Sequence, residues 1–315
     1  MQRPVLVVNA GSTSLKLTLV ESDGASEHVE SLGVLSDRVA AVGHRIVHGG
    51  ARFRDPVLID DDVERELHAL APLAPLHSEP ALRALAEARA AVPDAPHVAV
   101  FDTAFHATLP AEAATYAVPA RWRTDWGIRR YGFHGLSVEW VSRRVRVPRL
   151  VVCHLGGGCS VTAVRDGRSV DTTMGFSPLE GVPMATRAGS IDPGALLYLL
   201  RERRQTLDEL DRALEHESGL AALGGLDDPL GFGVYTYRIA GAVAAMAAAL
   251  DGLDAVAFSG GVGENRPDVR EAVAARLAFL GDFRVEVVSA REDLVIAEAV
   301  RRLLDERGSV TAGTA

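Results

Sequence analysis

The chain opens with two runs of apolar residues that are separated by a loop of small and hydroxyl-bearing residues. Residues 5–9 predict a strand, and residues 14–20 predict a second one, in which leucines alternate with polar side chains. The pattern of the following hundred residues predicts, in chain order, strands over 28–35 and 41–47, helices over 60–70 and 79–91, and a short buried strand over 98–101.

The opening pattern returns near residue 150. Residues 150–154 predict a strand, 155–158 a glycine turn and 160–164 an alternating strand. Around this repeat we expect helices over 135–146, 192–204, 207–216, 234–250, 266–280 and 292–306, strands over 169–173, 255–259 and 284–288, and a frayed tail over 309–315. Strands alternate with helices in both halves, which indicates an α/β protein. The repeat predicts two similar domains facing each other, each offering one glycine hairpin to a cleft between them.

Composition narrows the kinds of partner. The 315 residues carry a formal net charge of −9, which argues against nucleic acid or an anionic membrane as the main partner. The longest apolar stretch, 239–250, is too short to span a bilayer, and no signal-like segment opens the chain. Cys153 and Cys159 fit no zinc motif, so we interpret them as small core residues. We therefore expect a cytoplasmic protein that handles small molecules.

Three glycine-rich segments follow predicted strands, and they favour phosphate as a ligand. The first contains Lys16, the single lysine among 33 lysine and arginine residues. A lysine ammonium is a compact charge suited to a phosphate oxygen, and glycine lets backbone N–H groups approach an anion. The third segment, 260–263, leads into a helix and turns a helix N-terminus toward any anion. The chain contains neither a Walker-type loop nor a dinucleotide-binding glycine motif.

Several longer motifs make the sequence resemble the acetate kinases, the acetate and propionate branch of the actin-like phosphotransferases. The resemblance covers most of the chain and rests on the segments Val5–Lys16, Val42–Gly50, Phe101–His106, Arg129–Gly135, His154–Gly156, Gly175–Gly181, Met184–Arg187 and Gly261–Asn265. It implies two duplicated actin-like, ribonuclease-H-like domains with an active-site cleft between them. The implied boundaries are 1–101 plus 293–315 for the first domain and 102–292 for the second.

The resemblance also implies a reaction: Mg²⁺- or Mn²⁺-dependent transfer of a phosphoryl group between ATP and acetate, giving acetyl phosphate and ADP. Positioning and charge neutralisation dominate such a transfer. Because a carboxylic acid titrates near ~4, the acceptor is already ionised and needs no general base. This separates the interpretation from sugar kinases of the same architecture, whose acceptor hydroxyl must lose a proton.

Roles for individual residues follow from the same resemblance. Arg45 and Arg187 would flank the transferring phosphoryl, His134 would donate a hydrogen bond to it, and Asp102 would orient an arginine or a metal-bound water. The other expected site residues are Val47, Leu76, Phe133 and Pro178 around the acyl group, Ser12, Ser14, Lys16, His154, Gly156, Gly157, Gly261 and Gly263 on the nucleotide and its phosphates, and Asn9 with Glu292 on the metal.

The sequence departs from the family pattern mainly on the donor side. The chain has fewer residues than the family pattern over 20–41 and over 219–233. The second of these ranges corresponds to the family's adenine-contacting loop, and Gly157 replaces an asparagine. Further departures are Leu136, Val138, Ser190 and Arg291. Pyrophosphate as donor, or a catalytically weak module that binds an acyl phosphate or nucleotide, therefore stay as alternatives. A homodimer is implied by the family, and the apolar helix over 234–250 is either its interface or part of the core.

Overall fold

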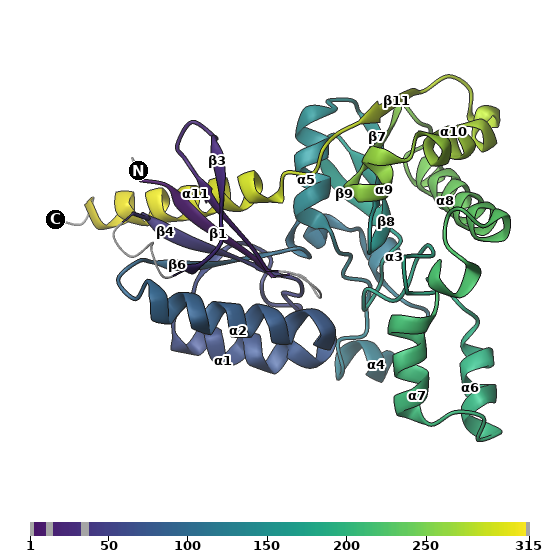
Figure 1. Ribbon diagram of the computed structural model, residues 1–315, viewed down its shortest axis with the longest axis horizontal. Helices are drawn as coiled ribbons and strands as arrows, with labels where there is room; N and C mark the ends of the chain where they lie inside the picture. The colour runs from purple at the N-terminus through teal and green to yellow at the C-terminus, as the bar shows by residue number, and fades with distance from the viewer. Residues whose placement is uncertain (1–2, 11–14, 33–37, 313–315) are drawn as a thin grey trace. The chain divides into compact units, whose positions relative to one another are not determined.

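The computed structural model describes residues 3–10, 15–32 and 38–312, with the backbone alone for Pro75, Leu76 and residues 308–312. The chain divides into two compact units (Figure 1). The first consists of Met1–Phe105 and Arg291–Ala315, and the second of His106–Ala290. Each unit is built around one mixed β-sheet, and the two are described in turn.

The first unit's sheet contains six strands among the described residues, in the order β3-β2-β1-β4-β6-β5. β1 pairs antiparallel with β2 and parallel with β4, and β4 continues the parallel arrangement to β6. The strands are β1 Val5–Ala10, β2 Leu15–Val20, β3 Ser26–Val29, β4 Ala41–Ile46, β5 Val57–Leu58 and β6 His97–Phe101. The carboxyl ends of β1, β4 and β6 therefore share one edge of the sheet.

Helices cover both faces of this sheet (Figure 1). α1 (Asp61–Leu70) and α2 (Pro75–Ala91), joined by the 3₁₀ turn Ala71–Leu73, lie on one face, and α11 (Glu292–Ala312) lies on the other. α11 approaches β4 so closely that a Cβ at Gly43 would stand 2.6 Å from Ile296 Cγ2. The glycine in this strand thus allows the C-terminal helix to pack on the sheet.

The second unit repeats the strand order of the first. Its described strands run β11-β10-β7-β8-β9, with β7 antiparallel to β8 and parallel to β10, as β1 is to β2 and β4. β8 pairs antiparallel with β9, and β10 pairs parallel with β11. The strands are β7 Arg149–Leu155, β8 Cys159–Arg165, β9 Arg168–Thr172, β10 Ala255–Ser259 and β11 Arg284–Val287. This duplicated topology confirms the predicted internal repeat.

The second unit's longest helix, α8 (Pro229–Ala249), packs against β7, β8, β9 and α10. It begins at Asp228, whose carboxylate accepts a hydrogen bond from Leu230 N at 2.8 Å. Among the described helices it alone is long and apolar enough to cross a membrane, but its buried residues recur at helical spacing toward the sheet. Its buried face therefore belongs to the core of this unit, and the interface prediction for 234–250 stays a prediction.

The remaining helical segments contain ten residues or fewer and lie between β6 and β11 in the chain. They are the 3₁₀ turns Ala104–Thr108, Ala221–Leu223 and Ala278–Leu280, the π-helical turn Ala213–Glu217, and the helices α3 Ala111–Ala114, α4 Ala120–Thr124, α5 Gly135–Arg144, α6 Pro193–Arg201, α7 Leu207–Arg212, α9 Gly260–Asn265 and α10 Pro267–Arg276.

Several predicted boundaries were wrong. α2 begins at Pro75 rather than at residue 79, because a proline fits the first helical turn. α11 continues to Ala312, so the backbone is helical over 309–312, where a frayed tail was expected; residues 313–315 lie outside the described residues. The units divide after Phe105 and before Arg291, which places Asp102 and Glu292 in the first unit rather than the second.

Candidate active site

Four predicted site residues of the first unit meet at the carboxyl edge of its sheet. Asn9 lies in β1 and Arg45 in β4, Asp102 directly follows β6, and Glu292 is the first residue of α11. Arg45 donates to both carboxylate oxygens of Asp102, from Nε to Oδ1 at 3.0 Å and from Nη2 to Oδ2 at 2.5 Å. Parallel strands bring these side chains together because their carboxyl ends coincide.

The same guanidinium links the pair to the other two residues. Arg45 Nη1 donates to Asn9 Oδ1 at 3.1 Å, and Asn9 Nδ2 donates to Glu292 Oε2 at 3.0 Å. Glu292 Oε2 also lies 3.7 Å from Arg45 Nε. We call these four residues the Arg45 cluster. It is a closed hydrogen-bonded group in which two carboxylates surround one cation.

Burial and charge act in opposite directions on the ionisable pair of this cluster. Burial raises the pKa of the Asp102 carboxyl, and the charge and hydrogen bonds of Arg45 counteract that shift. Burial disfavours the charge on Arg45, but Asp102 and Glu292 outweigh it and raise the pKa of the guanidinium above its ordinary value. Arg45 therefore remains charged, and its bidentate contact favours the ionised form of Asp102.

Within the Arg45 cluster, Glu292 is the residue that could hold a divalent cation, because both Asp102 oxygens accept from Arg45. The described residues contain no group of three or more His, Cys, Asp or Glu side chains arranged for a metal. Mg²⁺ suits such a place, because it takes one or two carboxylates and keeps several waters. The carboxylate of Glu292 supplies a hard oxygen ligand, whereas the amide oxygen of Asn9 already accepts from Arg45.

Lys16 lies on the same sheet face as Asn9. The two are direct Cα partners in the antiparallel pairing of β1 with β2, and opposed residues project to one face. The Lys16 side chain is exposed, at the strand end next to the hairpin loop. Ser12 and Ser14 belong to residues 11–14, which lie outside the described residues.

In the second unit the corresponding hairpin is the turn Gly156–Gly158 between β7 and β8. Gly156 N donates to Gly158 O at 3.0 Å, and Ala185 N donates to Gly157 O at 3.2 Å. The thiol of Cys159 contacts Gly156 O at 3.4 Å and the Tyr235 hydroxyl at 3.2 Å. The turn is therefore held from several sides, including the core helix α8.

Two histidines and Arg187 converge on this turn. A Cβ at Gly158 would stand 2.9 Å from Arg187 Nη2 and 3.1 Å from His134 Nε2, and a Cβ at Gly156 would stand 3.9 Å from His154 Nε2. The rings of His134 and His154 are 4.3 Å apart between centroids. We call His134, His154, Arg187 and the glycine turn the Arg187 group. Glycine at 158 leaves space beside two nitrogen atoms, Arg187 Nη2 and His134 Nε2, which suits an anion.

The backbone at His134 is unusual. Its φ of 60° and ψ of 21° lie in the left-handed region, which few non-glycine residues adopt. His106 supports this turn, because its Nε2 lies 2.9 Å from Phe133 O and its Nδ1 lies 2.9 Å from Ser169 Oγ. Burial lowers the pKa of His106 to about 4, so its ring is neutral at physiological pH.

Arg187 is held by a backbone carbonyl rather than by an acid. Its Nη1 donates to Pro178 O at 2.9 Å, and the residue is 8% exposed. Burial lowers the pKa of Arg187, an effect opposed by the negative charge of Glu215. A guanidinium stays protonated despite such a shift. Its charge is thus available to an anion at the glycine turn.

The third glycine segment lies next to this turn. Gly261 N would be 3.7 Å from a Cβ at Gly156, and Gly260, with a φ of +78°, allows β10 to pass closely over Leu155. Gly260 N donates to Glu264 Oε1 at 3.0 Å, so this amide already has a partner. The helix that follows, α9, spans Gly260–Asn265 only, which limits the predicted helix-terminus effect. Gly263 is buried against β10.

The predicted acyl-contacting residues are divided between the units. Val47 is a buried residue of the first unit, and only the backbone of Leu76 is described. Phe133 and Pro178 are buried in the second unit.

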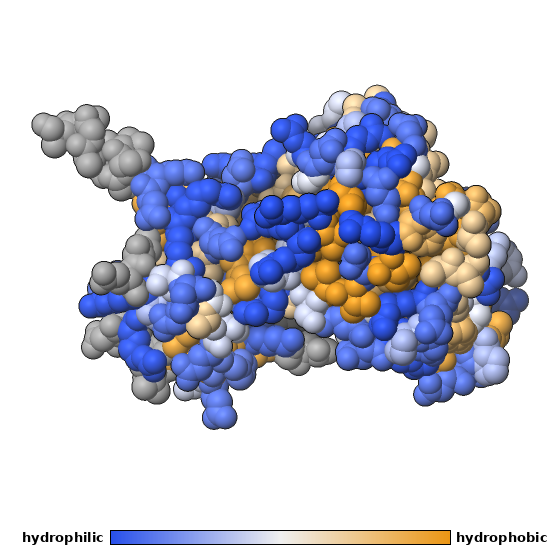
Figure 2. Space-filling view, turned by 90° about the horizontal axis from the view of Figure 1, so that it is seen from above, coloured by the Kyte–Doolittle hydropathy of each residue, from blue (hydrophilic) through white to orange (hydrophobic). Residues whose placement is uncertain are grey.

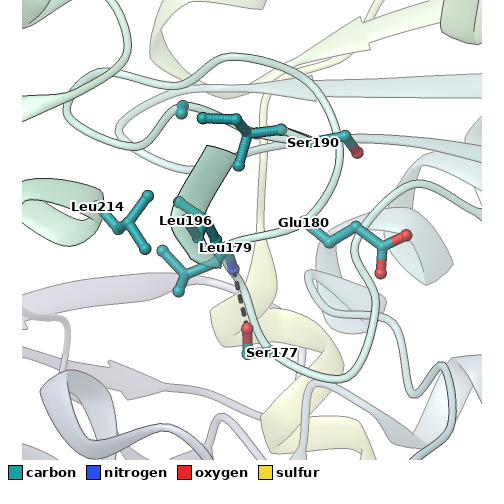
Figure 3. A pocket seen from close by; sticks show the side chains of 9 residues that line it. Ser177, Leu179, Glu180, Ser190, Leu196 and Leu214 are labelled. Atoms are coloured by element: carbon teal, nitrogen blue, oxygen red, sulfur yellow. Dashed lines mark hydrogen bonds between the residues drawn. The ribbon is translucent and has the colours of Figure 1, made fainter. Parts of the chain in front are cut away.

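A pocket of about 310 Å³ lies beside the loop that carries Pro178, but other residues line it (Figure 3). Leu179, Leu196 and Leu214 gather on one side of it, and Leu179 N donates to Ser177 Oγ at 3.3 Å.

Sequence reasoning missed the residues that hold these groups in place. Ser137 and Ser160 contact the two histidines, and nothing in the local sequence relates residues 17 and 26 positions apart. The motif Arg129–Gly135 contains Arg130 but assigns it no role. Its Nη1 donates to the carbonyls of Thr172, Thr173 and Met174, and its Nη2 pairs with Glu180 at 2.8 Å, so it anchors the loop before Pro178.

Two sheets of duplicated topology, the first with an acid–arginine cluster at its strand ends and the second with two histidines and an arginine around a glycine turn, fit a two-domain phosphotransferase of the actin-like class. The family model of the Acetokinase family matches residues 28–299. An acetate kinase from Synechococcus is 44% identical, with 84% of this chain and 77% of that protein covered. An acetate kinase from Clavibacter michiganensis is 41% identical, with 98% and 94% covered.

Solved structures agree. A propionate kinase from Francisella tularensis superposes with a TM-score of 0.88 at 30% identity, covering 94% of this chain and 98% of that one. Porphyromonas gingivalis acetate kinase superposes with a TM-score of 0.82 at 29% identity, covering 96% and 100%. The chain therefore belongs to the acetokinase family, and it is a kinase with a carboxyl group as acceptor.

Proposed function

We propose that this protein transfers the γ-phosphoryl group of ATP to the carboxylate of acetate, reversibly, giving acetyl phosphate and ADP. The observation that carries the proposal is that a chain of the acetokinase family retains both arginine centres, the Arg45 cluster and the Arg187 group. Propionate is the alternative acceptor, because one methylene changes binding by only ~1–3 kcal/mol.

In the proposed reaction a carboxylate oxygen of acetate forms a bond to the γ-phosphorus, and the bond from that phosphorus to the β–γ bridging oxygen breaks. ADP leaves with the electron pair. Asp102 and Asn9 hold the Arg45 guanidinium in a fixed orientation, and His134 and Arg187 donate hydrogen bonds to the phosphoryl oxygens, whose charge is spread over three atoms. No side chain accepts a proton.

Mg²⁺, with Mn²⁺ as a substitute, is the proposed cation, with Glu292 as its main protein ligand. The cation would neutralise charge on the phosphates of the nucleotide. Glu292 is the suitable group because it is 14% exposed and carries a carboxylate next to Arg45. Replacing it by glutamine should raise the metal concentration needed for half-maximal activity.

Pyrophosphate as donor is a second candidate, and two observations favour it. The alignment with the Clavibacter protein extends over 376 positions, more than the 315 residues of this chain, so that relative carries insertions. The short segment between Gly219 and α8 forms a tight turn, in which Gly225 N donates to Leu220 O at 2.9 Å. A small donor needs fewer contacts on this side than ATP.

A donor and acceptor screen tests these proposals. ATP, GTP and pyrophosphate are combined with acetate, propionate and butyrate, and the acyl phosphate is trapped with hydroxylamine. Acetyl phosphate formed from ATP, and lost in Arg187→Ala, supports the proposed reaction. If acetyl phosphate forms from pyrophosphate and not from ATP, pyrophosphate is the donor. The absence of product from every pair, in both directions, leaves the binding module as the better interpretation.

A cytoplasmic homodimer is proposed as the form in which the protein acts. α6 supports an interface, because none of its residues is buried although its sequence is mostly apolar; Leu197 is 47% and Tyr198 55% exposed. The second unit also exposes hydrophobic residues on the face away from α6, which Figure 2 shows from above. Light scattering coupled to gel filtration measures the mass, and a monomer at micromolar concentration contradicts the proposal.

A further inference from the structure

Two buried serines lie behind the two histidines of the Arg187 group. Ser137 Oγ, on α5, is 2.8 Å from His154 Nδ1, and Ser160 Oγ, on β8, is 3.1 Å from His134 Nδ1. Both serines are fully buried. In each ring the serine contacts Nδ1, while Nε2 faces the glycine turn.

We propose that Ser137 and Ser160 are positioning residues that donate their hydroxyl protons to the two Nδ1 atoms. Each ring is then held as the neutral tautomer with its proton on Nε2. The arrangement aims two N–H donors at the turn between β7 and β8. The roles of the rings in phosphoryl transfer rest on the proposed function; the tautomers do not.

The chemistry of the turn favours this direction of the hydrogen bonds. A neutral imidazole has one N–H, and the nitrogen that carries it is fixed by the partner of the other nitrogen. If Nδ1 donated to the serine, Nε2 would present a lone pair to an anionic phosphoryl, which is repulsive. With the serine as donor, both Nε2 atoms can donate to phosphoryl oxygens next to the charge of Arg187.

The short distance between the two rings favours neutral imidazoles with fixed tautomers. The two rings lie 4.3 Å apart at an interplanar angle of 33°, so two positive charges there would repel each other. A neutral pair with fixed tautomers supplies two donors without that cost. Serine does this with a short side chain, since its hydroxyl rotates to donate.

NMR of the whole protein with ¹⁵N-labelled histidine reads the tautomers directly, because protonated and unprotonated ring nitrogens resonate at well-separated frequencies. The signals are assigned by their loss in His134→Gln and His154→Gln. We expect the proton on Nε2 of both rings at pH 7.5. In Ser160→Ala the His134 signals should move toward a mixture of tautomers, and in Ser137→Ala those of His154 should do so. A ring that carries its proton on Nδ1 in the unmodified protein overturns the assignment for that ring.

Kinetics give a second readout. Losing one hydrogen bond should lower activity roughly 3–10-fold. In Ser160→Ala the loss should fall on kcat, because His134 is the proposed donor to the transferring phosphoryl. In Ser137→Ala it should fall on KM for the nucleotide. Ser160→Thr and Ser137→Thr keep a hydroxyl and should recover most of the loss.

Ser142→Ala is the matched control, since Ser142 lies on α5 like Ser137 but bonds to Glu139 O. It should leave both tautomers and rates unchanged. If the alanine variants at 137 and 160 behave like this control in both measurements, the inference is wrong. If the unmodified protein transfers no phosphoryl group, the proposed function fails, while the NMR measurement still decides the tautomers.

Discussion

The two arginine centres are built differently, although each follows from the same sheet topology. Arg45 contacts Asp102 through two hydrogen bonds and lies 3.7 Å from Glu292. Arg187 makes no ion pair with a carboxylate in the part of the chain that the structure describes, and its Nη1 donates to the Pro178 carbonyl. Carboxylates of the protein neutralise most of the charge of Arg45, whereas the charge of Arg187 can be neutralised by a bound anion.

This difference indicates a division of labour. A compensated and doubly hydrogen-bonded arginine is rigid, so the Arg45 cluster contributes to stability as well as to orientation. An arginine buried next to a glycine turn, without an acidic partner, is costly in the free protein and is best stabilised when an anion binds. The predictions below separate these two roles.

The largest effect is expected for Arg187→Ala. Removing an uncompensated cation that stabilises transition-state charge should lower kcat by about 10³-fold. The free protein should be as stable as before, or more stable, because a buried unpaired charge has gone. Steady-state assays and urea denaturation measure the two quantities. Arg165→Ala serves as control, since Arg165 is exposed and pairs with Asp251 at the surface. A stability loss in Arg187→Ala equal to that of Arg45→Met contradicts the division of roles.

Arg45→Met should lower both activity and stability. It leaves the fully buried Asp102 carboxylate without its partner, at a cost of about 3–5 kcal/mol in the free energy of unfolding. The double variant Arg45→Met with Asp102→Leu should recover much of the stability but no activity. If the single variant unfolds at the same urea concentration as the native protein, Arg45 is not part of a stabilising pair.

Acidification should destabilise the protein through its buried neutral histidines. Burial lowers the pKa of His106 to about 4, against about 6.5 in an unfolded chain. Between pH 6.5 and 4 the imidazole is protonated in the unfolded state and stays neutral in the folded state. The free energy of unfolding therefore falls as the pH decreases, by about 3 kcal/mol for this group. Urea midpoints from pH 7 to 5 measure the slope, and His106→Gln should show a smaller one. Equal slopes contradict the assignment.

The smallest effect concerns the glycine turn of the Arg187 group. A Cβ at Gly157 would meet nothing within 4 Å, so Gly157→Asn should fold normally and add an amide donor. One hydrogen bond should lower KM for the phosphoryl donor by about 2–10-fold. Gly158→Ala is the opposite case, because its Cβ would crowd Arg187 and His134 and should impair activity. If KM rises in Gly157→Asn, the missing amide donor at residue 157 does not weaken binding of the phosphoryl donor.

Sequence patterns predicted the element order well where periodicity or capping was strong. β1, β4, β7 and β10 are short apolar runs, and α1 begins after Asp60, whose carboxylate accepts from Val63 N at 2.8 Å. The segment Val57–Leu58 was missed, because two residues carry no periodicity. The ends of α2 and α11 were wrong, since helix ends depend on tertiary packing.

The composition of the Arg45 cluster was predicted residue by residue from motifs, but its bonding pattern was not. Asn9, Arg45, Asp102 and Glu292 are far apart in the chain, and only the shared carboxyl edge of parallel strands and the returning helix α11 bring them together. The serines behind the histidines were not predicted at all, because a hydroxyl that orients a ring leaves no periodic or compositional signal.

The sequence by itself determined the alternation of strands and helices, the internal repeat, the family and the identity of the charged groups, because periodicity and motifs are local properties of the chain. Tertiary structure decided which cation is paired and which is left uncompensated, and which ring nitrogen faces the glycine turn. Those outcomes depend on burial and on contacts between residues that are distant in sequence, where small differences in distance determine the hydrogen-bond partner.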